Sequence, residues 1–117
     1  FCDFDGCLVK NSSKFANKPW SMIPIEDNIE CLSDLQRRKN TKLIIVTSRP
    51  NSEKIKIKRF LKKYNINCQD ILTNLLHSKR IMINDYSATN PYPTSVSINI
   101  PRNDIEMNRI LKSITEN

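Results

Sequence analysis

Two carboxylates near the start of the chain have a spacing that suits phosphoryl-transfer chemistry. Asp3 and Asp5 are separated by one residue, follow an apolar start and are followed by Gly6. Gly6 is the only glycine in the chain, and it lets the backbone turn sharply so that both carboxylates can approach one site. One carboxylate could attack phosphorus, while the other exchanges protons with the leaving oxygen and with water. A divalent cation would offset the repulsion between carboxylates and phosphate, and Mg²⁺ prefers such oxygen ligands.

The elements that would position these carboxylates alternate along the chain between short apolar strands and amphipathic helices. The strands are runs of apolar, often β-branched residues, and we expect them at 1–4, 43–46, 70–72, 81–83 and 96–100. The helices show apolar residues at helical spacing, and we expect them at 27–39, 50–64 and 103–114. This alternation favours an α/β fold: a Rossmann-like three-layer sandwich with a mostly parallel sheet of about five strands, covered on both faces.

Polar residues follow several of these strands at the point where each strand ends. Asp3 and Asp5 follow the first strand, Thr47 follows the second, and Asp85 follows the fourth. In open parallel sheets the ligand site lies beyond the carboxyl ends of the strands. We therefore expect these side chains to meet at one edge of the sheet.

At these residues the sequence resembles the haloacid dehalogenase (HAD) superfamily of phosphatases. The DxDG signature of the family's first motif is matched by residues 1–8 (FCDFDGCL), and the second motif by residues 43–49 (LIIVTSR). The third motif is a lysine, for which Lys79 is our choice. The fourth is an acidic residue after a strand, matched by residues 81–85 (IMIND). The resemblance covers residues 1 to about 100 and implies the same α/β fold.

The resemblance implies a role for each of these groups. Asp3 would be the nucleophile that takes up the phosphoryl group, and Asp5 would be the general acid/base. Thr47 would hydrogen-bond the phosphoryl oxygens. Lys79, or alternatively Arg80, would neutralise the charge of the phosphate. The groups expected to contact the substrate are Gly6, Ser48, Arg49 and Arg80.

The same resemblance implies a Mg²⁺ cofactor. Its expected ligands are Asp3, the main-chain carbonyl of Asp5, and Asp85. The fourth motif of the family often carries two acidic residues, whereas Asp85 stands alone here. Asn84 and Asn90 are the nearest neutral substitutes, so the groups that complete the metal shell are left open.

The chain has no room for the cap domain with which many of these enzymes select substrates. Residues 8–26 suffice only for a short flap, in which Trp20 is expected to be a packing residue or a loop anchor. Residues 1–117 are therefore expected to form one capless HAD-like domain. Because the first strand starts abruptly and without an initiator Met, we expect a few upstream residues to be missing. An open site of this kind admits large substrates or is closed by homo-oligomerisation, and His77 is expected to be a surface loop residue.

Two stretches late in the chain suggest a substrate class. Residues 83–93 (INDYSATNPYP) and 98–102 (INIPR) resemble small HAD-like proteins linked to the synthesis of capsule and other surface polysaccharides. A sugar phosphate or a phosphorylated sugar acid is the substrate that this resemblance implies. Two alternatives stay open. One is a phosphatase for nucleotides or nucleic-acid ends, and the other is a non-catalytic HAD-derived binding domain of a larger biosynthetic protein.

Composition and charge narrow the class of partners. The formal net charge is +7, but the lysines are scattered and no aromatic stacking series accompanies them, so a nucleic-acid partner is not favoured. The given sequence has no apolar run that could span a bilayer, and its first residues lack the basic segment and apolar core of a signal peptide. We therefore expect a cytoplasmic protein without a membrane partner. The four cysteines include no CxxC pair, so reduced thiols are expected rather than a zinc site.

Overall fold

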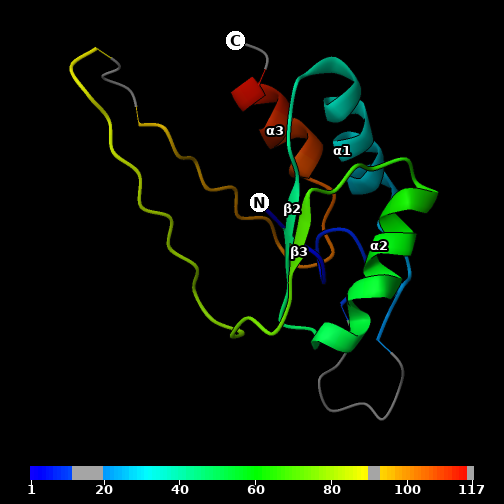
Figure 1. The fold of residues 1–117 in the computed structure, drawn as a ribbon. Helices are drawn as coiled ribbons and strands as arrows, with labels where there is room; N and C mark the ends of the chain where they lie inside the picture. The colour runs from blue at the N-terminus through cyan, green and yellow to red at the C-terminus, as the bar shows by residue number, and fades with distance from the viewer. Residues whose placement is uncertain (12–19, 90–92, 116–117) are drawn as a thin grey trace.

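The computed structural model describes residues 1–11, 20–89 and 93–115, and it has an α/β fold built on one parallel sheet (Figure 1). The sheet has the order β1-β2-β3, with strands β1 (Cys2–Asp3), β2 (Ile44–Val46) and β3 (Asp70–Leu72). The helices are α1 (Glu26–Arg38), the 3-10 helix η1 (Asn51–Glu53), α2 (Lys54–Lys63) and α3 (Met107–Thr115). The α/β class and the first three predicted strands are confirmed.

Strand β2 lies at the centre of the sheet because it is the most apolar of the three. Its Ile45 is fully buried and pairs with Cys2 of β1 on one side and with Ile71 of β3 on the other. Each parallel pair is joined by a crossover that carries a helix, as parallel strands require. The carboxyl ends of the three strands therefore lie at the same edge of the sheet.

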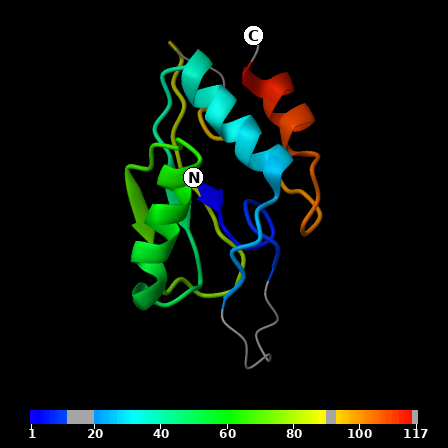
Figure 2. The same cartoon turned by 90° about the vertical axis from the view of Figure 1, so that its right-hand side faces the viewer.

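The helices supply most of the core that supports this sheet. Helices α1 and α2 lie on the same side of the sheet, and α3 packs beside α1 (Figures 1 and 2). The apolar face of α2 buries Ile57, Phe60 and Leu61, and the ring of Phe60 meets that of Phe4 edge-on, with 5.5 Å between centroids. Burial of each such side chain contributes about 1.5–3 kcal/mol. Phe4 is thereby fixed between the two carboxylates of the sequence motif.

The last helix begins later than the sequence predicts. Asn103 has a positive φ of 65°, a conformation that a right-handed helix cannot continue. Asp104 then caps the turn, because its Oδ1 accepts the backbone N–H groups of Ile105 and Glu106 at 2.6 and 3.1 Å. Helix α3 therefore starts only at Met107, which leaves residues 101–104 as a turn.

The structure differs from the prediction at 81–83 and 96–100, where no strand forms. Both runs lie in an arm, residues 81–89 and 93–100, that leaves the domain and returns to it (Figure 1). Ile81 and Ile83 are 80% and 89% exposed rather than buried. A β-branched run becomes a strand only where a neighbour offers backbone partners and cover, and the arm does not pair with β1. A sheet of about five strands and a three-layer sandwich are therefore not confirmed.

The two limbs of the expected flap, residues 8–11 and 20–25, run antiparallel to each other. The Lys10 N–H donates to the Ile23 carbonyl at 2.8 Å, and the Ile25 N–H donates to the Leu8 carbonyl at 2.9 Å. These bonds hold the flap limbs directly after the carboxylate motif. The remainder of the predicted flap, 12–19, and Asn90 lie outside the described residues.

Candidate active site

A tight loop after β1, the carboxylate loop (residues 3–7), brings Asp3 and Asp5 to the same edge of the sheet. The carbonyl of the buried Phe4 accepts backbone N–H bonds from the three residues that follow Gly6. Gly6 has a φ of +82°, which favours glycine, and its N–H donates to the Val9 carbonyl at 2.8 Å. The backbone therefore reverses within the motif, as its residue types predict.

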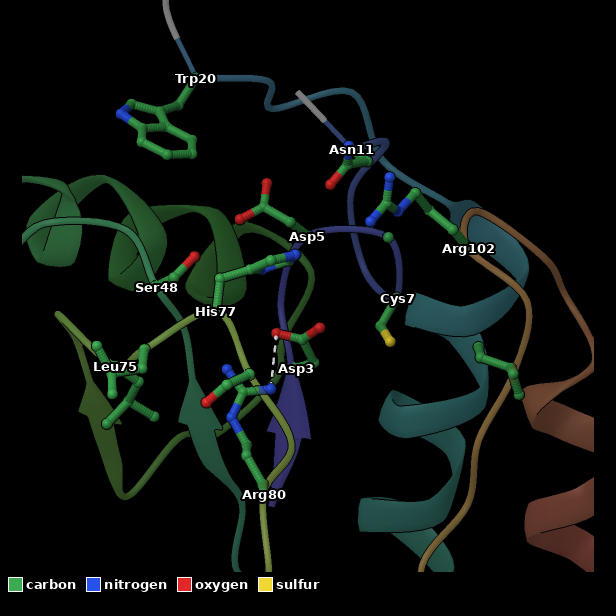
Figure 3. A pocket seen from close by; sticks show the side chains of 14 residues that line it. Asp3, Asp5, Cys7, Asn11, Trp20, Ser48, Leu75, His77, Arg80 and Arg102 are labelled. Carbon is green, nitrogen blue, oxygen red and sulfur yellow. Dashed lines mark ion pairs between the residues drawn. The ribbon is translucent and has the colours of Figure 1, made fainter. Parts of the chain in front are cut away.

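The two carboxylates line a cavity of about 1250 Å³ (Figure 3). Its walls come from the carboxylate loop, the flap limbs, the loops after β2 and β3, and the turn before α3. The polar and aromatic side chains that line the cavity with the two carboxylates include those of Asn11, Trp20, Ser48, His77, Ser78, Arg80 and Arg102. The cavity lies beyond the carboxyl ends of the strands, where an open parallel sheet places its ligands.

Asp3 is the more exposed of the two carboxylates. Its side chain is 41% exposed, against 16% for Asp5. Partial burial raises the pKa of the Asp3 carboxyl above its ordinary value, and the nearby Arg80 acts in the opposite direction. Arg80 Nη1 lies 3.7 Å from Asp3 Oδ1. Asp3 thus presents its oxygens to the cavity beside a cation, an arrangement suited to attack on a phosphate.

Asp5 is held by Arg49, whose side chain has no exposed surface. Arg49 donates from Nε to Oδ2 of Asp5 at 2.9 Å and from Nη2 to Oδ1 at 2.7 Å, a bidentate pair that fixes the orientation of the carboxylate. Its Nη2 also donates to the Ser21 carbonyl. The guanidinium carbon lies 4.9 and 5.1 Å from the ring centroids of Phe4 and Trp20. Arg49 therefore ties the carboxylate loop to the flap from behind the cavity.

Of the two hydroxyl residues that follow β2, Ser48 lines the cavity and Thr47 does not. Thr47 is 1% exposed, and its Oγ1 accepts the backbone N–H of Arg49 at 3.1 Å. The Thr47 hydroxyl thus stabilises the turn that positions Arg49. The contact expected between Thr47 and the phosphoryl oxygens stays a prediction, and Ser48 is the one of the two hydroxyl residues that lines the cavity.

Lys79 and Asp85 are both exposed, and neither lines the cavity. Arg80, the alternative to Lys79, lines the cavity and approaches Asp3. Asp85 lies in the arm, where its carbonyl accepts a hydrogen bond from the Thr94 hydroxyl at 3.0 Å. Because the arm is not paired with β1, it does not bring Asp85 to the edge of the sheet.

Asp3 and Asp5 offer the oxygen donors of this cavity that suit Mg²⁺. This ion prefers carboxylate and carbonyl oxygens and keeps several waters when one or two carboxylates bind it. Within residues 1–11, 20–89 and 93–115, no three His, Cys, Asp or Glu side chains are gathered closely enough to hold a metal. The donors at Asp3 and Asp5 fit Mg²⁺ with water completing the shell, and Asp85 would have to move to join them.

Cys7 also lines the cavity. Burial, followed by the negative charge of Asp3, raises the pKa of the Cys7 thiol to about 11. The thiolate is the reactive form of cysteine. The raised pKa therefore favours the protonated, less reactive form of Cys7.

Among the cavity residues to which the sequence assigned no part in the chemistry are Trp20, His77 and Arg102. The position of Trp20 could have been predicted, because Trp20 lies in the segment expected to form a flap over the site. Arg102 ends the 98–102 stretch that resembles polysaccharide-associated proteins. His77 carried no such pattern, and it reaches the cavity only because the loop after β3 passes the edge of the sheet (Figure 3).

Comparison of the chain with protein-family models, curated proteins and solved structures found no match in any of the three. In the part of the chain that the structure describes, no helix combines the length and apolar character needed to cross a membrane. The functional inference therefore rests on the motif resemblance and on the geometry around Asp3 and Asp5.

Proposed function

We propose that this protein is a Mg²⁺-dependent phosphomonoester hydrolase of the HAD type that acts through an aspartyl-phosphate on Asp3. The observation that carries the proposal is the pair Asp3 and Asp5 on one tight loop, facing a cavity that also presents Arg80. Neighbouring carboxylates repel each other, so their presence at a cavity favours a role with a cation and a phosphate. The proposed substrate is a sugar phosphate or a similar small metabolite, and the cavity of about 1250 Å³ can accept one.

The proposed reaction has two steps. First, an Asp3 oxygen bonds to phosphorus while the bond from phosphorus to the leaving oxygen breaks, and Asp5 gives that oxygen a proton. Then Asp5 takes a proton from a water molecule that attacks the phosphorus, and the bond between Asp3 and phosphorus breaks to release inorganic phosphate. Arg80 supports both steps by balancing charge on the phosphoryl oxygens. Mg²⁺, bound at Asp3 and the Asp5 carbonyl, would offset the charge between carboxylate and phosphate.

Asp5 needs one free oxygen to act as the acid/base, and both of its oxygens accept hydrogen bonds from Arg49. Arg49 also contacts Ser21 and Trp20 in the flap. A shift of the flap on substrate entry would therefore move Arg49 and release one oxygen of Asp5. In this proposal the flap couples substrate binding to proton transfer.

The finer features of the expected fold are also part of the proposal. Strand β1 is an edge of the described sheet, and an unpaired edge can accept a further strand. Ile81 and Ile83 are exposed apolar residues that come soon after Arg80 in the chain. The side chain of Arg80 itself lies beside Asp3. We propose that the arm docks along β1 when metal and phosphate bind. Docking would extend the sheet toward the expected five strands and bring Asp85 to the metal.

A non-catalytic binding domain is the second candidate, and the position of Asp85 away from Asp3 is the observation that favours it. Such a domain would bind a phosphate or a partner without turnover. It would need neither a nucleophile nor Mg²⁺-dependent chemistry, so measurement of hydrolysis separates it from the enzyme.

Hydrolysis of p-nitrophenyl phosphate with and without Mg²⁺ tests the proposed function. We expect Mg²⁺-dependent turnover by the wild type and a loss of about 10³-fold or more in Asp3→Asn, which removes the nucleophile. Asp34→Asn is the matched control, because Asp34 forms its ion pairs with Arg37 and Arg38 on the same helix and does not line the cavity. Equal turnover in Asp3→Asn and the wild type would rule out the aspartyl-phosphate mechanism.

A further inference from the structure

The turn at residues 101–104 is fixed against the carboxylate loop, although it lies far from that loop in the sequence. The Asn103 N–H donates to the Gly6 carbonyl at 2.8 Å, and Asn103 Oδ1 accepts the backbone N–H of Asn11 at 2.9 Å. These two bonds tie the turn both to the loop that carries Asp3 and Asp5 and to the first flap limb.

A buried side-chain amide of α1 also holds this turn. Asn28 has no exposed surface, and its Nδ2 donates to the Cys7 carbonyl and to the Asp104 carbonyl, both at 2.8 Å. One side chain thus holds the carboxylate loop and the turn together. These bonds fix the backbone of the two residues that follow 102, and so the point from which the side chain at 102 extends.

The side chain at that position is Arg102, and the cavity makes room for it. A Cβ at Gly6 would lie 3.1 Å from Cγ of Arg102, so the absence of a side chain at Gly6 lets the arginine stem pass over the loop. Arg102 lines the cavity, and in Figure 3 its guanidinium points inward from the side of Asn11 and Cys7, whereas Arg80 approaches Asp3 from another side.

The acidic groups of the cavity already have cationic partners. Asp3 lies beside Arg80, and Asp5 is engaged by Arg49. Across residues 1–11, 20–89 and 93–115, no ion pair or hydrogen bond of the Arg102 guanidinium is formed. An arginine on a fixed turn, directed into a cavity and without an internal anion, is suited to bind an anion from outside.

We propose that Arg102 forms a second anion subsite, which binds a carboxylate or a second phosphate of the substrate while the reacting phosphate lies at Asp3. This inference rests on the proposed function and narrows its substrate class to phosphate esters that carry another anionic group. The planar guanidinium fork matches both carboxylate and phosphate oxygens. The cavity volume of about 1250 Å³ leaves space for a substrate body between the two subsites.

Three phosphate esters test the subsite: 6-phosphogluconate with a carboxylate, fructose 1,6-bisphosphate with a second phosphate, and glucose 6-phosphate with no second anion. We expect the wild type to have a higher kcat/KM for at least one of the first two, and the one preferred identifies the second anion. Arg102→Met should lower kcat/KM for that substrate about 10- to 100-fold and change glucose 6-phosphate less than about 3-fold. Arg102→Lys should restore part of the loss, and Arg59→Met on the exposed side of α2 is the control for general charge.

The possible failures are distinguishable. An equal loss on all three esters, or no preference of the wild type for a second anion, overturns the subsite while leaving the hydrolase intact. Absence of turnover of every ester, and of p-nitrophenyl phosphate, overturns the proposed function instead. Calorimetry then still tests the subsite. The subsite requires that Arg102→Met weaken the binding of the anionic esters and leave the binding of glucose 6-phosphate unchanged.

Discussion

At the scale of single residues, Asp5 and Arg49 form a bidentate ion pair whose arginine is fully buried. Arg49 is fully buried, with Asp5 at 2.7 Å and the buried Glu53 at 3.7 Å. Removal of one partner from a buried ion pair leaves an uncompensated charge and costs about 3–5 kcal/mol. We expect Arg49→Met to lower the free energy of unfolding by about this amount in urea titrations. Arg59→Met, at an exposed position, should change it by less than about 0.5 kcal/mol.

A double variant tests whether this loss comes from the unpaired carboxylate. Asp5→Asn combined with Arg49→Met removes both charges, so the double variant should be more stable than the sum of the two single losses implies. Strictly additive losses would contradict a direct coupling between Asp5 and Arg49.

The pKa of Asp3 makes a second prediction at the residue scale. Because burial raises this pKa, the folded state holds the proton more tightly than the unfolded chain does, and the ionised carboxylate lowers stability once the pH is above the folded pKa. In EDTA at pH 7, we expect Asp3→Asn to raise the free energy of unfolding. The gain should stay below about 1 kcal/mol because the side chain is 41% exposed and water screens its charge.

The pH dependence supplies the control for this prediction. The difference between Asp3→Asn and the wild type should shrink as the pH falls, and it should be absent below the ordinary value of 3.8, where the carboxyl is protonated in both states. Denaturant unfolding followed by circular dichroism at several pH values measures it. A wild type more stable than the variant at pH 7 in EDTA would mean that the Arg80 contact outweighs the cost of burial.

At the scale of the elements, α1 organises the site through Asn28. Its amide bonds to the carbonyls of Cys7 and Asp104 join α1, the carboxylate loop and the turn before α3. Replacement by alanine leaves these carbonyls without their donor, at a cost of about 1–3 kcal/mol for each unsatisfied group. We expect Asn28→Ala to lower the free energy of unfolding by about 2–4 kcal/mol, whereas Asn108→Ala on the exposed side of α3 should have little effect. Equal effects of the two changes would contradict this role of Asn28.

At the scale of the whole molecule, the arm decides whether the sheet has three strands or more. The molecule measures 52 Å along its longest axis against 28 and 25 Å along the others, and the arm extends from one side of it (Figure 1). If the arm docks on β1, the amides of residues 81–85 should gain protection from hydrogen exchange when Mg²⁺ and beryllium fluoride, an analogue of the aspartyl phosphoryl group, are added. Asp3→Asn, which cannot bind the analogue covalently, is expected to show no such gain.

Ile83 gives a matched test of the docked arm. Its side chain is 89% exposed, so Ile83→Ser should not change the free energy of unfolding without ligands, but it should reduce the protection gained with Mg²⁺ and the analogue. Protection that rises with protein concentration would show that the arm pairs with a second copy of the chain and would contradict docking on β1.

The sequence by itself determined the local features of this protein. An apolar run with β-branched residues at 43–46 made the central strand, and apolar residues at helical spacing made α1 within about one residue of the expected bounds. The helix expected at 50–64 is divided into the 3-10 helix η1 (Asn51–Glu53) and α2 (Lys54–Lys63). Gly6 follows the two carboxylates, and its positive φ allows the tight loop that leads into the first flap limb. These features depend on a few neighbouring residues, because backbone preference and the hydrophobic period act over short distances.

Tertiary structure alone decided which polar groups share the cavity. Thr47 and Ser48 are adjacent, yet only Ser48 lines the cavity, and Arg49 turned inward to Asp5, 44 residues away in the chain. Arg102 reached the site through bonds of its turn to Gly6 and Asn11 that no local pattern encodes. The apolar run at 81–83 looked like a buried strand, but burial needs a partner edge, and a sequence pattern cannot show whether that edge is occupied.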